Sequence, residues 1–265
     1  MPSRKRGEGR NARSTARTSR SGLIDRRDEG DNRKVPIETP KRIMSSLLTA
    51  GPPTAHLDAP MKLYVTYTSP YARLARIVVA EKMLHGRVEV IEAKTRTPGS
   101  PYFLINPSGR VPYLLDDAGV GMEDSQLICE YLDSLDGNPR FHGLPFAAWA
   151  YRRLEAAARS MCDGISVWAR EMSRPANERS PTILAHEVAR SQRMADFFEG
   201  QVADPLLQGA PGMAHFVLAV ALDAARRRGL GDLTDGRTRL GRWMGHISKM
   251  PSMQATVPPA SARPG

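Results

Sequence analysis

The sequence predicts an α/β domain of element order βαβ–ββα, followed by an all-helical domain, behind a basic N-terminal extension. Three observations lead to this prediction: a β-rich alternation that begins at Met61, helix start signals that follow the predicted strands, and no strand pattern in the C-terminal half. The expected boundaries are 1–60 for the extension, 61–138 for the α/β domain and 146–255 for the helical bundle domain.

Length and composition fit one or two globular domains. The chain has 265 residues, of which 41% are apolar, enough for a sizeable core. Its net charge of +10 is uneven, since residues 1–60 carry +6 and residues 61–265 carry +4. A basic balance points to nucleic acid or an acidic surface as a partner, but the body of this chain is only mildly basic.

The extension, residues 1–60, is rich in Arg, Ser and Gly and has little to bury, so we expect it to be disordered. Its end, GPPTAHLDAP, is typical of a Pro-rich linker. Aromatic residues that stack on bases are absent from it, which argues against contact with nucleic acid. The alternative to a nucleic-acid-binding arm is a solvated tail, or a segment that is not translated because synthesis begins at Met61.

Cysteine and histidine usage indicates a reducing, cytoplasmic setting without a metal site. Cys129 and Cys162 lie in apolar helical patterns and are expected to be buried free thiols. Neither a disulfide framework, a secretory signal nor an apolar run of membrane-spanning length is evident. The six histidines are scattered without metal-ligand spacing, so we expect no metal.

The α/β domain is predicted to open with a βαβ unit. Lys62–Tyr67 alternates and is β-rich. Ser69 at an N-cap and Pro70 at the first helical position are a helix start signal, and Gly86 is the expected helix end. Arg87–Glu92 is the second strand, so the first two strands should be parallel.

The domain then continues as ββα. Thr95–Tyr102 is predicted to be a loop, Val111–Leu115 a third strand, and Asp116–Gly121 a turn into a short fourth strand. Asp124–Ser125 opens a helix that Ser125 is expected to cap. The helical patterns of the second domain are Phe146–Met172, Pro181–Val202, Met213–Arg228 and Arg239–Met250.

The order βαβ–ββα with a proline before the third strand describes a thioredoxin-like domain, and its reactive segment is altered here. Ser69 and Ala72 occupy the two positions of the Cys-x-x-Cys motif, so dithiol exchange is excluded. A helix N-terminus with a serine hydroxyl can still stabilise the thiolate of a ligand. Protein cysteines in such places fall from a pKa of ~8.5 to roughly 3.5–7.5. Taken alone, a Ser-Pro helix start is usually only a cap.

Two further features suit a peptide ligand. If the Val111–Pro112 peptide is cis, the N–H and C=O of Val111 are exposed to an extended peptide; otherwise Pro112 is an ordinary proline at a strand start. Ser125 at a helix N-terminus can bind a carboxylate and Asp124 can pair with an ammonium group, which together suit the γ-glutamyl end of glutathione. The alternative is a plain N-cap.

Three segments, TSPYARLARI, NPSGRVPYL and EDSQLICEYL, resemble the N-terminal motifs of glutathione S-transferases, particularly bacterial members with serine at the catalytic position. The helical half and its ending, Trp243 to Ser252, are also similar to that family. The resemblance covers about Met61 to residue 255. It implies that Ser69 is catalytic and stabilises the glutathione thiolate. The residues that it places against glutathione are Arg110, Val111, Pro112, Asp124 and Ser125.

Other residues have roles that the resemblance leaves open. Tyr64 and Tyr67 are alternative hydroxyl donors, since some branches of the family use tyrosine, although sheet packing is the commoner role for such residues. Tyr151 and Trp168 are candidate wall residues for a second substrate, or else core residues. Family members have a Ser/Thr-x-x-Asp cap where this chain has Gly212–His215, so we expect that helix to start less firmly.

The function implied by the resemblance is that of a glutathione transferase in detoxification. Glutathione would be the co-substrate and a hydrophobic electrophile the partner, in a homodimer without membrane contact. The alternative is a non-catalytic glutathione-binding or interaction protein with the same fold, because fold alone does not settle function. Peroxidase, isomerase and dehalogenase activities also remain open.

Overall fold

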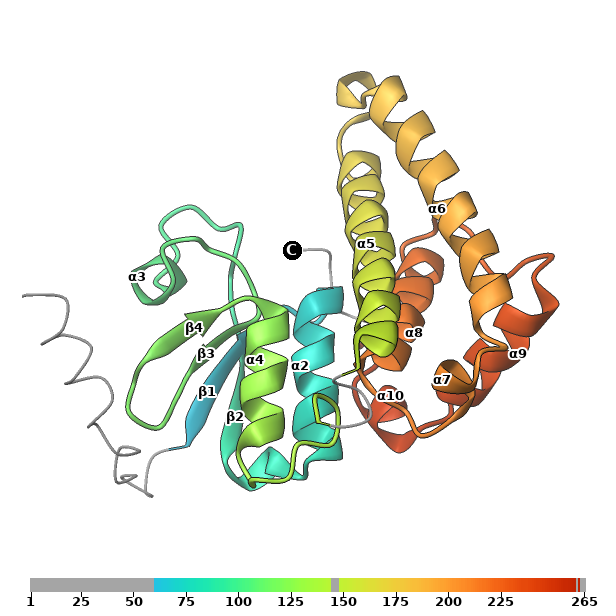
Figure 1. The fold of residues 1–265 in the computed structure, drawn as a ribbon. Coiled ribbons are helices and arrows are strands. Elements are labelled where there is room, and N and C mark those ends of the chain that lie inside the picture. Colours follow the sequence, from blue (N-terminus) through green and yellow to red (C-terminus); the bar gives the residue numbers. More distant parts are fainter. Residues whose placement is uncertain (1–59, 144–147, 261, 263–265) are drawn as a thin grey trace, which may run out of the picture. The chain divides into compact units, whose positions relative to one another are not determined.

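The structure, a computed structural model, describes residues 60–143, 148–260 and 262, and Figure 1 shows its arrangement. The predictions for the extension therefore lie outside the described residues, apart from Pro60. Four strands form one sheet in the order β2–β1–β3–β4. Strand β1 (Met61–Val65) pairs parallel with β2 (Val88–Glu92) and antiparallel with β3 (Tyr113–Leu115), and β3 pairs antiparallel with β4 (Gly121–Glu123). The predicted βαβ–ββα order and strand directions are confirmed.

Two helices cover one face of this sheet. Helix α2 (Pro70–Glu81) packs beside α4 (Ser125–Ser134), as Figure 1 shows. Both bury an apolar stripe, which in α2 includes Leu74, Ile77 and Val78. The stripe fixes the direction of α2 and thereby the place of its N-terminus.

In this region the end of one helix was predicted wrongly, and one short helix was not predicted. The first helix ends at Glu81 and not at Gly86, because Met83 adopts a left-handed conformation with φ of 53°. A separate 3₁₀ turn, Leu84–Gly86, follows and buries Leu84. The expected loop before the third strand leads into a short helix, α3 (Tyr102–Ile105), whose four residues are too few to show helical periodicity.

The C-terminal domain is all-helical in its described residues, as expected. Its long helices agree with the predicted ranges to within a few residues: α5 (Trp149–Met172), α6 (Pro181–Gln201), α8 (Met213–Arg227) and α9 (Thr238–Ile247). Two short helices, α7 (Pro205–Gln208) and α10 (Pro251–Ala255), were not predicted, although each carries proline at its first position. The predicted start of α5, at Phe146, lies outside the described residues.

Helix α8 is almost entirely buried. It packs on α5 and also on α2, so one apolar core runs from the sheet into the helical domain. Cys129 and Cys162 are buried free thiols in this core, as predicted, and burial raises the pKa of each thiol to about 12. Among the described helices none is long and apolar enough to cross a membrane.

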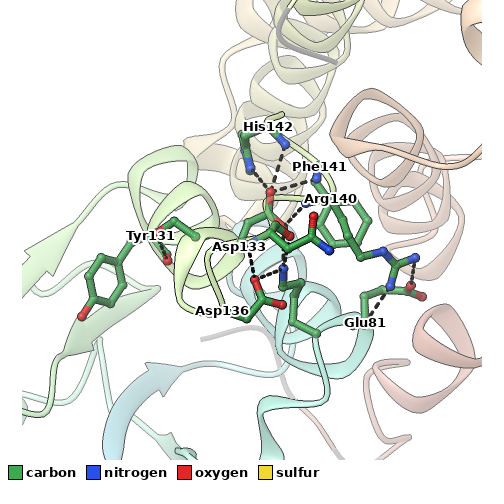
Figure 2. A network of polar contacts seen from close by, with 10 residues as sticks. Glu81, Tyr131, Asp133, Asp136, Arg140, Phe141 and His142 are labelled. Carbon is green, nitrogen blue, oxygen red and sulfur yellow. Dashed lines mark hydrogen bonds and ion pairs between the residues drawn. The ribbon is translucent and has the colours of Figure 1, made fainter. Parts of the chain in front are cut away.

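A buried carboxylate fixes the chain as it leaves α4 (Figure 2). Asp133 has no exposed surface, and it accepts hydrogen bonds from the backbone N–H groups of Arg140, Phe141 and His142 at 2.8–2.9 Å. The His142 Nδ1 lies 3.0 Å away, and the Nζ of Lys82 lies 3.5 Å from the other oxygen. Burial opposes ionisation of Asp133, but these hydrogen bonds outweigh it and hold the pKa below its usual value.

Asp133→Asn is expected to lower the free energy of unfolding by about 3 kcal/mol, because it removes the buried one of the two carboxylates that pair with Lys82 and part of the hydrogen bonding. Urea unfolding measures this. Asp136→Asn is the matched control, since Asp136 also binds Lys82 at 2.7 Å but is half-exposed, and it should cost much less. Equal losses in the two variants would contradict this role of Asp133.

Candidate functional site

Two adjoining cavities open at the N-terminus of α2. One of about 550 Å³, the first cavity, lies between α2, α5, α8 and the chain after α10. The other of about 580 Å³, the second cavity, lies between α2, the entrance to β3, the start of α4 and α5. The residues common to both are Thr68, Ser69, Pro70, Ser173 and Arg228. Ser69 therefore stands where the two cavities meet.

Ser69 is the N-cap of α2, as predicted. Its Oγ accepts a hydrogen bond from the N–H of Ala72 at 3.2 Å. The hydroxyl hydrogen has no acceptor within the described part of the chain, so it can be donated to a ligand. Ser180 makes the same Ser-Pro cap on α6 but lines neither cavity. A Ser-Pro cap alone is thus no sign of function. Ser69 differs from Ser180 because it lines both cavities.

At the entrance to β3, the backbone groups of one residue have no hydrogen-bond partner among the described residues. The Val111–Pro112 peptide is cis, which was the conditional prediction, and both residues line the second cavity. Within residues 60–143 and 148–260 the backbone of Val111 has no hydrogen-bond partner. The preceding carbonyl, that of Arg110, accepts from the Tyr102 hydroxyl and from the Asn106 Nδ2 at 3.0 Å. These two bonds hold the segment in place and leave the Arg110 side chain exposed in the second cavity.

At the start of α4 the expected roles of two residues are exchanged. Asp124 is the N-cap and Ser125 the first helical residue, because the Asp124 carboxylate accepts from the N–H groups of Gln126 at 2.8 Å and Leu127 at 3.2 Å. Asp124 holds a φ of 82°, a strained value for a residue with a side chain. Such strain gathers at ligand sites, and both Asp124 and Ser125 line the second cavity.

Arg159, on α5, was not predicted. Its Nη1 donates to the Ser125 Oγ at 3.3 Å, and its Nε donates to Glu155 at 2.8 Å. The helical domain thereby places a guanidinium beside the positive end of α4, where a carboxylate would be stabilised. No local pattern could reveal it, since 34 positions separate Arg159 from Ser125.

The alternative hydroxyl donors lie away from the cavities. Tyr64 is buried with its ring centroid 5.5 Å from that of Tyr102. The Tyr67 ring lies under the Arg76 guanidinium at 4.8 Å. Neither tyrosine lines the first or the second cavity. Their positions favour the packing role over the donor role.

Tyr71 is a further residue that sequence reasoning missed. It lines the second cavity, and its hydroxyl donates to Asp163 of α5, which joins the two domains beside Ser69. Burial, and then the nearby Cys162, raise the pKa of Tyr71. The hydroxyl is therefore protonated at neutral pH and acts as a fixed link.

Tyr151 and Trp168 are core residues and line neither cavity. Tyr151 has a different role, because its hydroxyl accepts from the N–H of Ala214 at 3.0 Å, in the first turn of α8. The N–H of Gly212 donates to the His215 Nδ1 at 3.2 Å. The expected weak start of α8 is thus wrong: a tyrosine from α5 and a histidine supply the cap. Burial lowers the pKa of His215 to about 4, so the ring is neutral and accepts this bond.

Tyr151→Phe is expected to lower the free energy of unfolding by about 1–2 kcal/mol, because it leaves a buried N–H of α8 without its acceptor. Urea unfolding measures the change. Tyr131→Phe is the control: this ring is half-buried and its hydroxyl makes no hydrogen bond to a described residue, so it should change stability by less than about 0.5 kcal/mol. A Tyr151→Phe variant as stable as the control would contradict the capping role.

Arg228, the residue after α8, was also not predicted as a site residue. Its Nη2 donates to the backbone carbonyl of Thr68 at 2.9 Å, directly before Ser69. It lines both cavities and is half-buried. Among the described residues no group of three His, Cys, Asp or Glu side chains could hold a metal ion.

Comparison with known protein sequences identifies the family of this chain. Residues 63–140 match the family profile described as glutathione S-transferase, N-terminal domain, and residues 181–246 match the profile described as glutathione S-transferase, C-terminal domain. The GST-like protein YibF of Escherichia coli (strain K12) is 31% identical over 149 residues, which cover 56% of this chain and 73% of YibF.

Solved structures include relatives with glutathione bound. A glutathione S-transferase from Methylobacillus flagellatus KT is 26% identical, with a TM-score of 0.67 over 75% of this chain and 100% of its own. A glutathione transferase family member from Pseudomonas fluorescens Pf-5 is 27% identical, with a TM-score of 0.67 over 76% of this chain and 100% of its own.

Proposed function

Because this chain belongs to the glutathione S-transferase family, we propose that it is a glutathione transferase that binds glutathione in the second cavity. The thiol of glutathione would lie at Ser69, at the junction with the first cavity, and the first cavity would receive a hydrophobic electrophile. Its apolar lining includes Met172, Val220 and Pro258. The two relatives with bound glutathione support the choice of ligand.

The backbone of glutathione would lie along the entrance to β3. The N–H and C=O of Val111 have no partner among the described residues and line the second cavity beside Pro112. They match the backbone of the cysteinyl residue, which offers one acceptor and one donor. Arg110, exposed next to them, would supply a positive charge for the peptide.

The γ-glutamyl end would lie at the start of α4. Its carboxylate would contact Ser125 and the guanidinium of Arg159, near the positive end of the helix dipole. Its ammonium group would pair with Asp124, whose carboxylate uses one oxygen for both capping bonds and leaves the other for a ligand. The three groups together fit the charges of an α-amino acid terminus.

The observation that carries the proposal is the O–H of Ser69, which lies at the junction of the cavities and has no acceptor among the described residues. The hydroxyl would donate to the sulfur, and the N-terminus of α2 would add its dipole, so the thiol releases its proton to solvent near neutral pH. The thiolate then forms a bond to the electrophilic carbon, and the leaving group departs with its electron pair.

Glutathione binding and glutathione-dependent turnover of an activated chloronitrobenzene, measured together on the purified protein, test this proposal. We expect saturable binding by calorimetry and turnover above the uncatalysed rate. Binding without turnover of several electrophile classes would favour the non-catalytic alternative. Absence of both would overturn the proposed function. The homodimer implied by the family stays a prediction that light scattering checks.

A further inference from the structure

Three arginines that line the second cavity have no acidic partner among the described residues. Arg228, Arg170 and Arg96 all line the second cavity, and Arg228 also lines the first. In the described residues their side chains contact no carboxylate. Arg228 donates to the Thr68 carbonyl, and the Nε of Arg170 donates to the Ser166 carbonyl at 3.2 Å. Both bonds leave the charge of the guanidinium uncompensated.

The carboxylates that line these cavities are engaged elsewhere. Asp223 lies in the first cavity and binds Arg73, Arg226 and Arg227. Those of the second cavity are bound by neighbouring donors: Glu123 by Asn106 and Ser108, Asp124 by the first turn of α4, and Asp163 by Tyr71. None of these carboxylates pairs with the three arginines.

The three charges also act on one another. Burial, and then the nearby charges of Arg96 and Arg170, lower the pKa of Arg228. Arg228 is half-buried, whereas Arg96 and Arg170 are exposed. Their like charges repel that of Arg228, and an anion placed among them relieves this repulsion. The proposed positions of the γ-glutamyl and cysteinyl parts of glutathione, at α4 and β3, leave Arg170 and Arg228 on the helical-domain side of the thiol.

We propose that the cavities select electrophiles that combine an apolar body with a carboxylate or similar anionic group, held by Arg228 and Arg170. The apolar body fits against Ala169, Met172 and Val220 in the first cavity, while the anion lies at the boundary with the second. The inference rests on the proposed function, because it takes the sulfur of glutathione to be at Ser69.

A matched pair of glutathione conjugates tests the selection without requiring catalysis. S-(carboxybenzyl)glutathione and S-(carbamoylbenzyl)glutathione have nearly the same shape, but only the first carries the extra charge. Calorimetry with the full chain should show the carboxylate conjugate binding about tenfold more tightly, the effect of one partly screened charge pair. Arg170→Gln should remove most of this preference.

Arg242→Gln is the control, since Arg242 is exposed on α9, lines neither cavity and carries the same charge. It should retain the preference, which separates a local contact from the effect of net charge. Arg228→Gln should also remove the preference, but Arg170→Gln is the cleaner variant because Arg170 does not touch the Ser69 segment.

Equal binding of the two conjugates, or a preference that persists in Arg170→Gln, would overturn the inference while glutathione binding still supports the proposed function. A variant that weakens glutathione and both conjugates equally would also overturn it, because the arginine would then hold glutathione itself. Failure of glutathione and both conjugates to bind would overturn the proposed function.

Discussion

Replacing Ser69 with alanine is expected to lower kcat for a chloronitrobenzene by about 10²–10³-fold, the usual effect of removing one donor that stabilises a reacting anion. The side chain lies at the junction of the cavities, and its O–H has no acceptor in the part of the chain that the structure describes. Glutathione should still bind, because in the proposed function Val111, Asp124, Ser125 and Arg159 would contact other parts of it. Steady-state kinetics and calorimetry on the same preparation measure both effects.

The chain provides a matched control for this variant. Ser180→Ala removes a hydroxyl with the same structural role, an N-cap followed by proline, whose Oγ accepts from the N–H of Ile183 at 3.3 Å. Each substitution costs about 1 kcal/mol of helix capping, but only Ser69→Ala should lose turnover. Equal kcat in the two variants would contradict the role of Ser69 and move attention to backbone donors.

Asp223→Asn is expected to have the largest effect on stability, about 3–5 kcal/mol, because it leaves a buried guanidinium without its counter-charge. Arg73 is 4% exposed, and its Nη1 lies 2.6 Å from the Asp223 Oδ2. Its other nitrogens donate to the carbonyl of Met253 and the hydroxyl of Thr256, so it links α2 to α8 and α10. Urea unfolding measures the loss.

The reverse variant, Arg73→Met, should cost less, because Asp223 keeps Arg226 and Arg227 as partners. Asp235→Asn is the control: this carboxylate is exposed and its side chain has no described partner, so the change should be within about 0.5 kcal/mol. An Asp223→Asn variant as stable as this control would contradict the role of Asp223 as the counter-charge of Arg73.

The effect of Asp223 also depends on pH. Burial opposes its ionisation, but the hydrogen bond from Arg227 and the charge of Arg73 outweigh it, so the folded-state pKa lies below the ordinary value of 3.8. A lowered carboxyl pKa contributes stability that is complete above the ordinary value and is lost as the pH falls toward the folded value. The difference between wild type and Asp223→Asn should therefore be constant above about pH 5 and shrink in acid.

Much of the fold follows from local patterns. The alternation near Met61, the Ser69–Pro70 start and the apolar stripe of α2 determine a βαβ unit that the structure confirms. Helix ends were less predictable. The end of α2 depends on Met83, whose left-handed backbone carries no sequence signal, since glycine or asparagine is the usual residue there.

Of the residues that line the second cavity, the sequence predicted only those that the α/β domain contributes. Ser69, Val111 and Asp124 are each marked by turn or cap chemistry within their own segments. Arg159 and Arg228 come from helices distant in sequence, and an arginine on a helix surface looks the same whether it faces solvent or a cavity. Only the packing of α8 against α2 and α5 distinguishes them.

The N-terminal cap of α8 also depends on residues that the local sequence does not reveal. The local motif is absent at Gly212, and this absence predicted a weak helix start. The structure supplies the missing acceptors through Tyr151 and His215 instead. A local pattern states which groups need a partner, but tertiary packing decides where the partner comes from.

In the proposed function, the protein binds glutathione with its thiol ionised at Ser69. The most direct test is a pH titration of the ultraviolet thiolate absorbance of glutathione bound to the wild-type protein. The bound thiol should have a pKa below ~7.5, compared with ~8.5 for an unperturbed thiol. A bound thiol that titrates at the unperturbed value would contradict this prediction.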